Sequence, residues 1–222
     1  MDKNLTDKIR HDFDRLAEQD VEQWNHNNHY HSFLLNQLPI DCSTVLDIGC
    51  GVGEFSRLLA QRADKVIAID LSPKSIEIAK QRSQQFNNID YQVADIREWE
   101  FPSEQFKAIA SIATVHHLSL KNLLPKLKAA LKPGGVLVIL DLLENKDLLR
   151  DFIAVPLNWY LTCKNRVEIS PEAREAMLKH LRTDRYLNLS QVKSIYSRFL
   201  TTPKIRKHLF WRYSVVWHKP IK

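Results

Sequence analysis

Val45-Leu46-Asp47-Ile48-Gly49-Cys50-Gly51-Val52-Gly53 is the stretch of sequence that decides the fold. A short apolar run with a β-branched residue leads into a turn in which glycine alternates with other residues. Directly after the turn, Phe55, Leu58 and Leu59 recur at helical spacing. The order strand, glycine turn, helix predicts one unit of an alternating α/β fold.

Glycine is rare in this chain, with five residues in 222, or about 2% against a usual ~7%. All five lie in two clusters, the turn at 49–53 and the pair Gly134-Gly135. We therefore expect each cluster to mark a place where the backbone needs a conformation or a close approach that only glycine allows.

Apolar runs and helical patterns alternate on both sides of the first turn. Strands are predicted at 43–48, 65–70, 89–93, 106–112, 136–140, 204–211 and 213–219. Helices are predicted at 55–60, after the capping pair Ser72-Pro73, at 120–131 and at 190–200. This alternation indicates a doubly wound, mostly parallel seven-stranded sheet with helices on both faces.

Two regions depart from the strand–helix alternation. Residues 1–38 are polar and are predicted to form an N-terminal helical cap on a main domain of residues 39–222. After Asp141, strand signals stop for about sixty residues, so 142–189 is interpreted as a helical insertion over the edge of the sheet. One of its helices is predicted to open at Ser170-Pro171-Glu172 and to carry one face made of Ala173, Ala176, Met177, His180 and Leu181.

Composition limits the class of protein. The chain is 44% hydrophobic and 26% charged, as expected for one globular domain. Three cysteines without CxxC spacing predict a reduced, cytoplasmic protein. The first residues lack an apolar leader, and the apolar run 136–140 is far shorter than the ~20 residues of a membrane span. We therefore expect neither secretion nor a membrane span.

The glycine turn predicts a nucleotide-like ligand, because backbone N–H groups at a helix start can approach such a ligand closely. Two ligand classes fit, a dinucleotide and S-adenosylmethionine (SAM). The dinucleotide fingerprint G-x-G-x-x-G needs glycine where this chain has Glu54. The dinucleotide interpretation is weaker for that reason.

Residues 43–141 resemble the class I SAM-dependent methyltransferases, whose fold is Rossmann-like with seven strands. The resemblance is carried by the turn at 45–53, by Asp70 nineteen residues beyond Gly51, by Ala94-Asp95-Ile96 and by 131–137. It implies SAM as the cofactor and an antiparallel strand at the end of the sheet.

The resemblance also implies cofactor-binding roles for individual residues. Asp70 would accept hydrogen bonds from both ribose hydroxyls, since a carboxylate offers two acceptor oxygens. Asp95 would accept from the adenine amino group between Leu71 and Ile96, and Asp47 would lie near the methionine amino group. The implied cofactor-binding set is Asp47, Gly49, Cys50, Gly51, Gly53, Asp70, Leu71, Asp95 and Ile96.

The segment after the fourth predicted strand holds the candidate catalytic residues. It lacks the Asn/Asp-Pro-Pro-aromatic signature of base-amino methyltransferases and the nucleophilic cysteine of cytosine-C5 enzymes. It reads His116-His117-Leu118, as in many small-molecule methyltransferases. Either histidine is a candidate general base or a packing residue. Tyr30 and His31 belong to the segment that folds over the cofactor in such enzymes, and Tyr30 is the third catalytic candidate.

Two other patterns leave alternatives open. His26, His29 and His31 suggest a metal, but they lack the i, i+4 spacing of metal-binding helices, so we expect no metal site. Residues 151–222 hold 14 basic and 5 acidic residues, or +9, which leaves −3 for 1–150. Alternation along the last two strands is expected to turn the aromatic residues inward and the charges into water. The charged and aromatic residues concerned are Lys204, Arg206, Lys207, His208, Phe210, Trp211, Arg212, Tyr213, Trp217 and Lys219.

The sequence thus favours a SAM-dependent methyltransferase that acts on a small molecule. A nucleic-acid methyltransferase is an alternative because of the basic C-terminal part. A catalytically silent SAM-binding module is another. The acceptor atom and the oligomeric state are not indicated.

Overall fold

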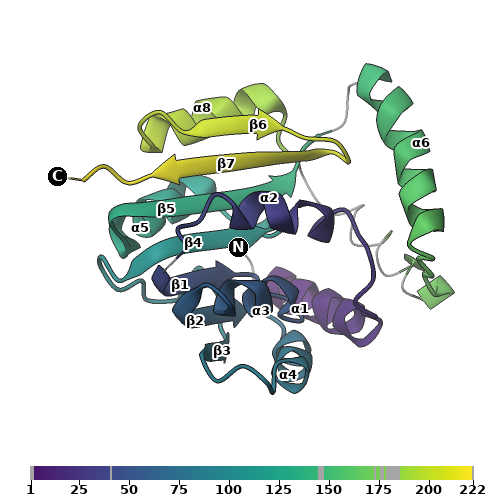
Figure 1. Cartoon of the computed structure of the whole chain (residues 1–222), viewed down its shortest axis with the longest axis horizontal. Helices are drawn as coiled ribbons and strands as arrows, with labels where there is room; N and C mark the ends of the chain where they lie inside the picture. The colour runs from purple at the N-terminus through teal and green to yellow at the C-terminus, as the bar shows by residue number, and fades with distance from the viewer. Residues whose placement is uncertain are drawn as a thin grey trace.

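A computed structural model describes residues 3–40, 42–144, 148–172, 174–175, 178 and 186–221. Its centre is a seven-stranded sheet with the order β3-β2-β1-β4-β5-β7-β6 (Figure 1). The strands are β1 Cys42–Ile48, β2 Ala63–Asp70, β3 Ile89–Val93, β4 Phe106–Ile112, β5 Leu131–Leu142, β6 Lys204–Lys207 and β7 Arg212–His218. β1 to β5 are parallel, and β7 runs antiparallel to its neighbours β5 and β6. The predicted fold class is confirmed.

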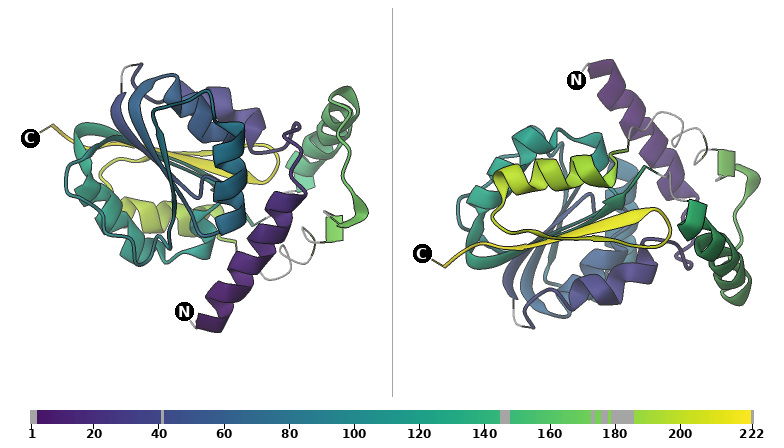
Figure 2. Two further views of the ribbon diagram at one scale, coloured as in Figure 1. Left: turned by 90° about the horizontal axis from the view of Figure 1, so that it is seen from below. Right: turned by 90° about the horizontal axis from the view of Figure 1, so that it is seen from above.

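Helices cover both faces of the sheet (Figure 2). The described helices are α1 Lys3–Glu18, α2 His31–Leu35, α3 Glu54–Ala60, α4 Pro73–Arg82, α5 Leu120–Ala130, α6 Leu148–Lys164 and α8 Leu189–Phe199, with short 3-10 turns η1 Asn28–Tyr30 and η2 Val115–His117. None of the helices within the described ranges is long and apolar enough to cross a membrane.

Two hydrophobic cores follow from the alternation of side chains along the buried strands. On β1, Leu46 and Ile48 join the core beneath α5 and α8, whereas Val45 joins the core beneath α2, α3 and α4. The predicted start of α4 is also confirmed, because the Ser72 hydroxyl accepts a hydrogen bond from Ser75 N–H (2.9 Å) and Pro73 occupies the first helical turn.

The last strand pair differs from the prediction in one respect. β6 ends at Lys207 rather than at residue 211, because Phe210 and Trp211 adopt positive φ angles of 55° and 57° in the turn before β7. Phe210, like Tyr213 and Trp217 on β7, is buried, as predicted. The prediction that the charges lie in water is wrong for Arg212, which is only 8% exposed and donates to Asn27 Oδ1 from Nε and Nη2 (both 3.0 Å).

The region after β5 contains α6, a helix whose bounds were not predicted from the sequence. It stands beyond the carboxyl ends of the parallel strands, not over the edge of the sheet (Figure 1). Leu143 and Leu187 form an isolated bridge at the two ends of this region. The helical face predicted from Ala173, Ala176, Met177, His180 and Leu181 lies outside the described residues.

Candidate active site

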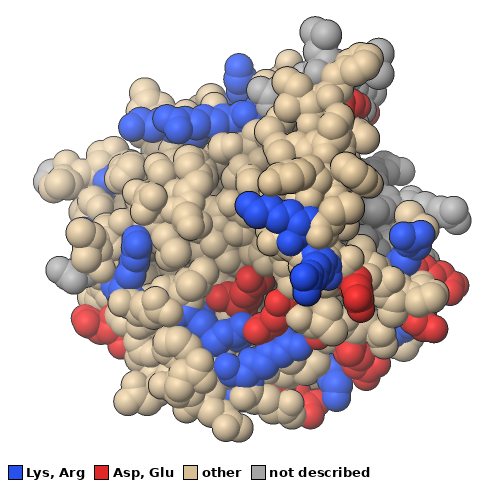
Figure 3. All heavy atoms as spheres, turned by 45° about the vertical axis from the view of Figure 1, so that its right-hand side comes forward, with Lys and Arg blue, Asp and Glu red and all other residues tan. Residues whose placement is uncertain are grey.

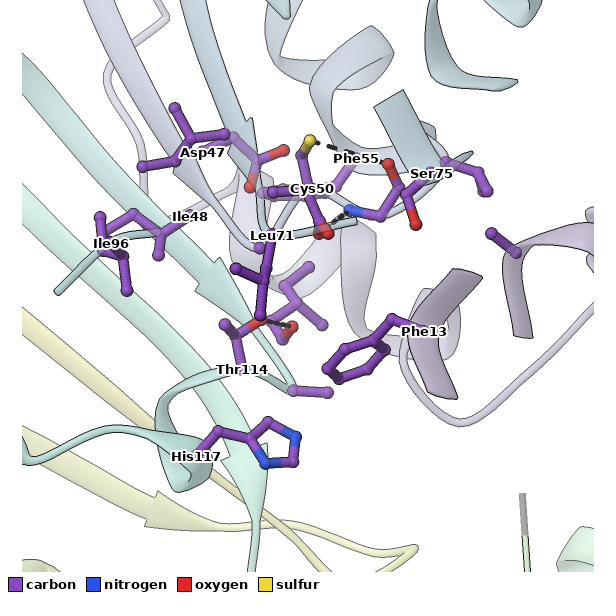
Figure 4. Close-up of a pocket in the computed structure, with 18 of the residues that line it drawn as sticks. Phe13, Asp47, Ile48, Cys50, Phe55, Leu71, Ser75, Ile96, Thr114 and His117 are labelled. Carbon is purple, nitrogen blue, oxygen red and sulfur yellow. Dashed lines mark hydrogen bonds between the residues drawn. The ribbon is translucent and has the colours of Figure 1, made fainter. Parts of the chain in front are cut away.

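A cavity of about 370 Å³ lies where the carboxyl ends of β1, β2 and β4 meet, and α1 covers it. A volume of this size is within the range of small-molecule and cofactor sites. Phe13 of α1 lies near Thr114 and His117 at one end, and Asp47 and Cys50 lie toward the other (Figure 4). α/β proteins bind ligands outside the carboxyl ends of the strands, next to the point where the strand order reverses, which in this sheet lies between β1 and β4.

The three glycines of the turn all have positive φ, but for different physical reasons. A Cβ on Gly49 (φ 69°) would lie 2.1 Å from Thr114 Oγ1, and one on Gly53 (φ 80°) would lie 2.3 Å from the Tyr91 hydroxyl. A Cβ on Gly51 (φ 53°) would meet no atom within 4 Å. Gly49 and Gly51 line the cavity, whereas the structure places Gly53 outside its lining. Gly51 is thus the position at which a ligand can approach the backbone.

Asp70 at the end of β2 is fixed by two backbone donors. Gly51 N–H donates to Oδ2 (2.9 Å) and Ser72 N–H donates to Oδ1 (2.8 Å). Burial raises the pKa of Asp70, and these two hydrogen bonds act in the opposite direction. Each carboxylate oxygen has a second lone pair, so the group is oriented to accept from two neighbouring hydroxyls of a ligand.

Asp47 and Cys50 form the buried end of the cavity. The Ser56 hydroxyl donates to Asp47 Oδ2 (2.6 Å), and burial raises the pKa of Asp47 to about 7. Burial also raises the pKa of the Cys50 thiol well above its usual value, helped by the negative charges of Asp70 and Asp47. Cys50 is therefore a neutral thiol at pH 7 and is unsuited to act as a nucleophile.

Asp95 lines the cavity together with Leu71 and Ile96, as the sequence predicts for an adenine pocket. Its carboxylate is held by Arg97, whose Nε lies 2.8 Å from Oδ1, and the hydrogen bond from Arg97 lowers the pKa of Asp95. Arg97 Nη2 also donates to the Thr6 hydroxyl of α1 (2.7 Å). Sequence reasoning missed Arg97, although a cation two residues beyond an acid was a visible signal.

The two adjacent histidines point to different surroundings. His117 lines the cavity, and its ring lies 5.4 Å from the Phe13 ring in an edge-on arrangement. His116 places Nδ1 2.6 Å from Asp141 Oδ1, at the buried end of β5. The two imidazole centroids are 3.9 Å apart. Asp141 was not predicted, although it ends the strand beside β4 and the carboxyl ends of neighbouring parallel strands lie together.

The third catalytic candidate, Tyr30, is not among the residues that line the cavity. Its hydroxyl donates to Leu209 O (3.0 Å), and its side chain is buried. The neighbouring His31 does line the cavity, and burial lowers its pKa to about 4, so its imidazole is neutral at pH 7.

The other histidines of this segment make contacts within the protein. His26 Nε2 lies 2.7 Å from Asn158 Oδ1 of α6, and its ring stacks on Phe210. The His29 ring packs edge-on against Tyr30. Within the ranges that the structure describes, no cluster of three His, Cys, Asp or Glu side chains is arranged to hold a metal ion.

α1 covers the cavity through one apolar face. Ile9, Phe13, Leu16 and Ala17 line the cavity and recur at helical spacing. The helix is fastened by polar contacts at two places, because Thr6 accepts from Arg97 and Asp14 contacts the hydroxyl of Ser72. This periodic pattern in residues 9–17 was the sequence signal for the cover, but periodicity alone does not say what the face covers.

Comparison with known proteins gives this arrangement a family. Residues 45–135 match the family described as a methyltransferase domain. An uncharacterized methyltransferase of Mycobacterium tuberculosis is 30% identical over 209 residues, which cover 90% of this chain and 99% of that protein.

The chain belongs to the class I SAM-dependent methyltransferases. A demethylmenaquinone methyltransferase of Tropheryma whipplei is 30% identical to it over 118 residues, which cover 53% of this methyltransferase and 49% of the relative. The crystal structure of the N-methyltransferase NodS from Bradyrhizobium japonicum with S-adenosylhomocysteine superposes with a TM-score of 0.64 at 18% identity, covering 94% of this chain and 98% of NodS. At that identity the superposition supports the shared fold.

The cavity of the methyltransferase fits its cofactor SAM. The open space in front of Gly51 is the room that a ligand next to the backbone needs, and the oriented carboxylate of Asp70 suits a ribose diol. Asp47 at the buried end offers an anionic partner for the amino group of the methionine part when its carboxyl is ionised. Carboxylates suited to the ribose and to the amino group of the cofactor thus lie along one cavity.

Proposed function

We propose that this methyltransferase transfers the methyl group of SAM to a small-molecule acceptor, and that the acceptor binds next to His117. The observation that carries the proposal is the position of His117, which comes from the end of β4 and lines the same cavity as the cofactor residues Gly51 and Asp70. When bound, SAM supplies a methyl group carried on a sulfonium. The leaving group is a neutral thioether, so it needs no general acid.

In this proposal, each end of the cavity has its own task. Asp70 and Gly51 hold the ribose, Asp47 holds the amino group, and Leu71 and Ile96 enclose the adenine with Asp95. Gly49, Cys50 and Gly53 form the backbone turn that brings these groups together. α1 keeps water out of the cavity, since Phe13 lies over the end next to His117.

The acceptor must also lose its proton, and we assign the role of general base to His117. The neighbouring His116 is a positioning residue, because a carboxylate at Nδ1 fixes the tautomer and orientation of an imidazole. Its ring is in contact with the ring of His117 and so limits the orientation of His117. For an acceptor that carries no acidic proton, catalysis depends on proximity and alignment alone.

The small-molecule part of the proposal rests on two observations. The relatives matched over half of this chain include a demethylmenaquinone methyltransferase, so phenolic and quinol rings are the first acceptors to test. In the C-terminal strand pair β6–β7 and its turn, Phe210, Tyr213 and Trp217 lie in the core and Arg212 is buried. This leaves few aromatic side chains on that surface for stacking with nucleic-acid bases, which supports a small molecule over RNA or DNA.

We also propose a reducing, cytoplasmic setting, because the described cysteines Cys42, Cys50 and Cys163 form no disulfide.

The proposal is tested by measuring S-adenosylhomocysteine formation with a panel of quinols, phenols, amines and carboxylic acids. With an accepted substrate, His117→Gln should lower kcat by about 10² while SAM affinity stays nearly unchanged. The control is His29→Gln, an exposed histidine outside the cavity lining. The general-base role of His117 would be refuted if His117→Gln retained turnover and the pH–rate profile of the parent enzyme had no limb near pH 6–7. Catalysis would then depend on proximity alone. SAM binding without product from any acceptor would favour the silent module.

A further inference from the structure

The helix α6 is attached to the protein by a face that is partly polar. Asp151 Oδ1 accepts from Trp211 Nε1 (3.0 Å), and Asn158 Oδ1 lies 2.7 Å from His26 Nε2. Ala154 between them is 2% exposed, and Leu157 and Leu161 pack against the core beneath α2 and α3. These positions recur every three or four residues, so they form the inward face of the helix.

The outward face of the same helix is apolar and exposed. Phe152 is 79% exposed, Trp159 70%, Ile153 60%, Val155 54% and Tyr160 53%. Residues 152–163 contain no charged side chain. A surface helix normally turns its apolar face inward, so α6 is inverted, and contiguous exposed apolar area of this kind marks an interaction surface.

The size of this face favours a lipid surface over a second protein chain. With ~200 Å² for each aromatic side chain, Phe152, Trp159 and Tyr160 expose about 400 Å², and the two aliphatic residues bring the total to roughly 600 Å². One side of a standard protein interface buries about 800 Å². Trp and Tyr are also the residues that suit the boundary between lipid headgroups and acyl chains.

Charges at the two ends of the apolar stretch point to an anionic surface. Arg150 precedes it in the sequence, and Lys164 and Arg166 follow it. Lys164 Nζ lies 6.0 Å from the centre of the Tyr160 ring, so this cation accompanies the outward face. Asp151 is turned inward onto Trp211, and in the sequence Asp147 and Glu168 are the other acids next to the apolar stretch. Figure 3 brings this side forward: the surface over α6 is largely uncharged, and Lys and Arg side chains lie next to it together with some Asp and Glu side chains.

α6 and the residues that follow it also contact residues 23–27, a segment that contributes to the lining of the cavity. Gln23 Nε2 donates to Glu168 O (2.7 Å), and Glu168 N–H donates back to Gln23 Oε1 (2.9 Å). His26, the partner of Asn158, stands between Asn25 and Asn27, which both line the cavity. α6 therefore packs against the segment whose Asn25 and Asn27 line the cavity.

We propose that α6 docks the methyltransferase onto an anionic lipid surface, with Phe152, Ile153, Val155, Trp159 and Tyr160 at the headgroup–acyl boundary and Lys164 and Arg166 on the lipid phosphates. Helices that lie in the interface in this way use aromatic and aliphatic residues on one face and basic residues at its border. The docking brings the segment that lines the cavity at Asn25 and Asn27 close to the lipid. It is independent of the identity of the methyl acceptor.

Vesicle co-sedimentation tests the proposal, with phosphatidylcholine vesicles compared with vesicles that contain phosphatidylglycerol. Phe152→Ser with Trp159→Ser should weaken binding by about 100-fold. Lys164→Gln with Arg166→Gln should weaken it by roughly 25-fold, on the anionic vesicles only. The matched control is Ile40→Ser, equally exposed at 79% but located before β1, at the opposite end of the strands. SAM affinity should be unchanged in all variants, which shows that they fold.

A fluorophore on Cys163 gives an independent readout, because Cys163 is exposed on α6 while Cys42 and Cys50 are buried. Brominated lipid should quench this fluorophore. Absence of vesicle binding, or binding that the Phe152 and Trp159 substitutions leave unchanged, would overturn the proposal. A concentration-dependent dimer that the same substitutions dissociate would also overturn the proposal, because a second copy of the chain would then cover this face.

Discussion

Replacement of Asp70 by alanine tests the central assignment of the cofactor site. The carboxylate is fixed by Gly51 N–H (2.9 Å) and Ser72 N–H (2.8 Å), so it meets the ribose hydroxyls without having to reorient. Hydrogen bonds to a charged group contribute about 1.5–3 kcal/mol net, and loss of this range corresponds to roughly ten- to hundred-fold weaker SAM binding.

Isothermal titration calorimetry with SAM measures this change directly. Asp64→Ala is the matched control, because Asp64 lies on the same strand but is exposed near its amino end. Because burial raises the pKa of Asp70, its charge is lost earlier on acidification than that of an ordinary aspartate. Affinity of the parent protein should therefore fall as the pH is lowered, and this fall should be weaker in Asp70→Ala. Equal affinity of Asp70→Ala and the parent at pH 7.5 would refute the ribose assignment.

Two further predictions concern the glycine turn and the buried acid behind it. Gly51→Val should abolish SAM binding, because its Cβ would enter open space in the cavity, and it should lower the melting temperature only through the strain of a side chain at φ 53°. Gly53→Ala combines a positive φ of 80° with a Cβ that would lie 2.3 Å from the Tyr91 hydroxyl, so its main effect should be on the melting temperature; the reverse pattern in titration and thermal unfolding would contradict both assignments. Asp47 has a pKa of about 7 in the folded state against 3.8 for an ordinary aspartate. Between these two pH values the folded chain holds a proton that the unfolded chain has lost, so the contribution of Asp47 to stability declines as the pH rises through this window. In denaturant unfolding, Asp47→Asn should therefore become more stable relative to the parent from pH 5 to pH 8, and a constant difference would show that Asp47 is ionised throughout.

The sequence predicted those parts of the site that depend on local motifs. Asp70, Asp95 and His117 each follow a recognisable strand, and the carboxyl ends of parallel strands meet at one edge, so their meeting in one cavity follows from the fold. The glycine turn was predicted because it stands between a recognisable strand and a recognisable helix. What the sequence could not show was that Gly53 packs against Tyr91, so that a Cβ there would lie 2.3 Å from the Tyr91 hydroxyl.

Pairings between distant segments were beyond sequence reasoning. His116 and Asp141 meet because β4 and β5 are neighbours, and Arg212 is buried because Asn27, 185 residues away, accepts from its guanidinium. Strand alternation placed Arg212 in water, since period-2 patterns describe faces of a sheet and not the partners that cover them. The outward apolar face of α6 breaks the usual pattern, and exceptions of this kind are expected where a surface has a function.

The cover formed by α1 has a consequence for the rate of turnover. Its fastenings lie toward both ends of the nucleoside region, at Thr6 through Arg97 to Asp95 and at Asp14 to Ser72, beside Asp70. Because α1 covers the cavity between these fastenings, we expect cofactor exchange to require a lifting of the helix. If that exchange is slower than methyl transfer, the first turnover will show a burst of product, and a linear time course without a burst would refute this expectation.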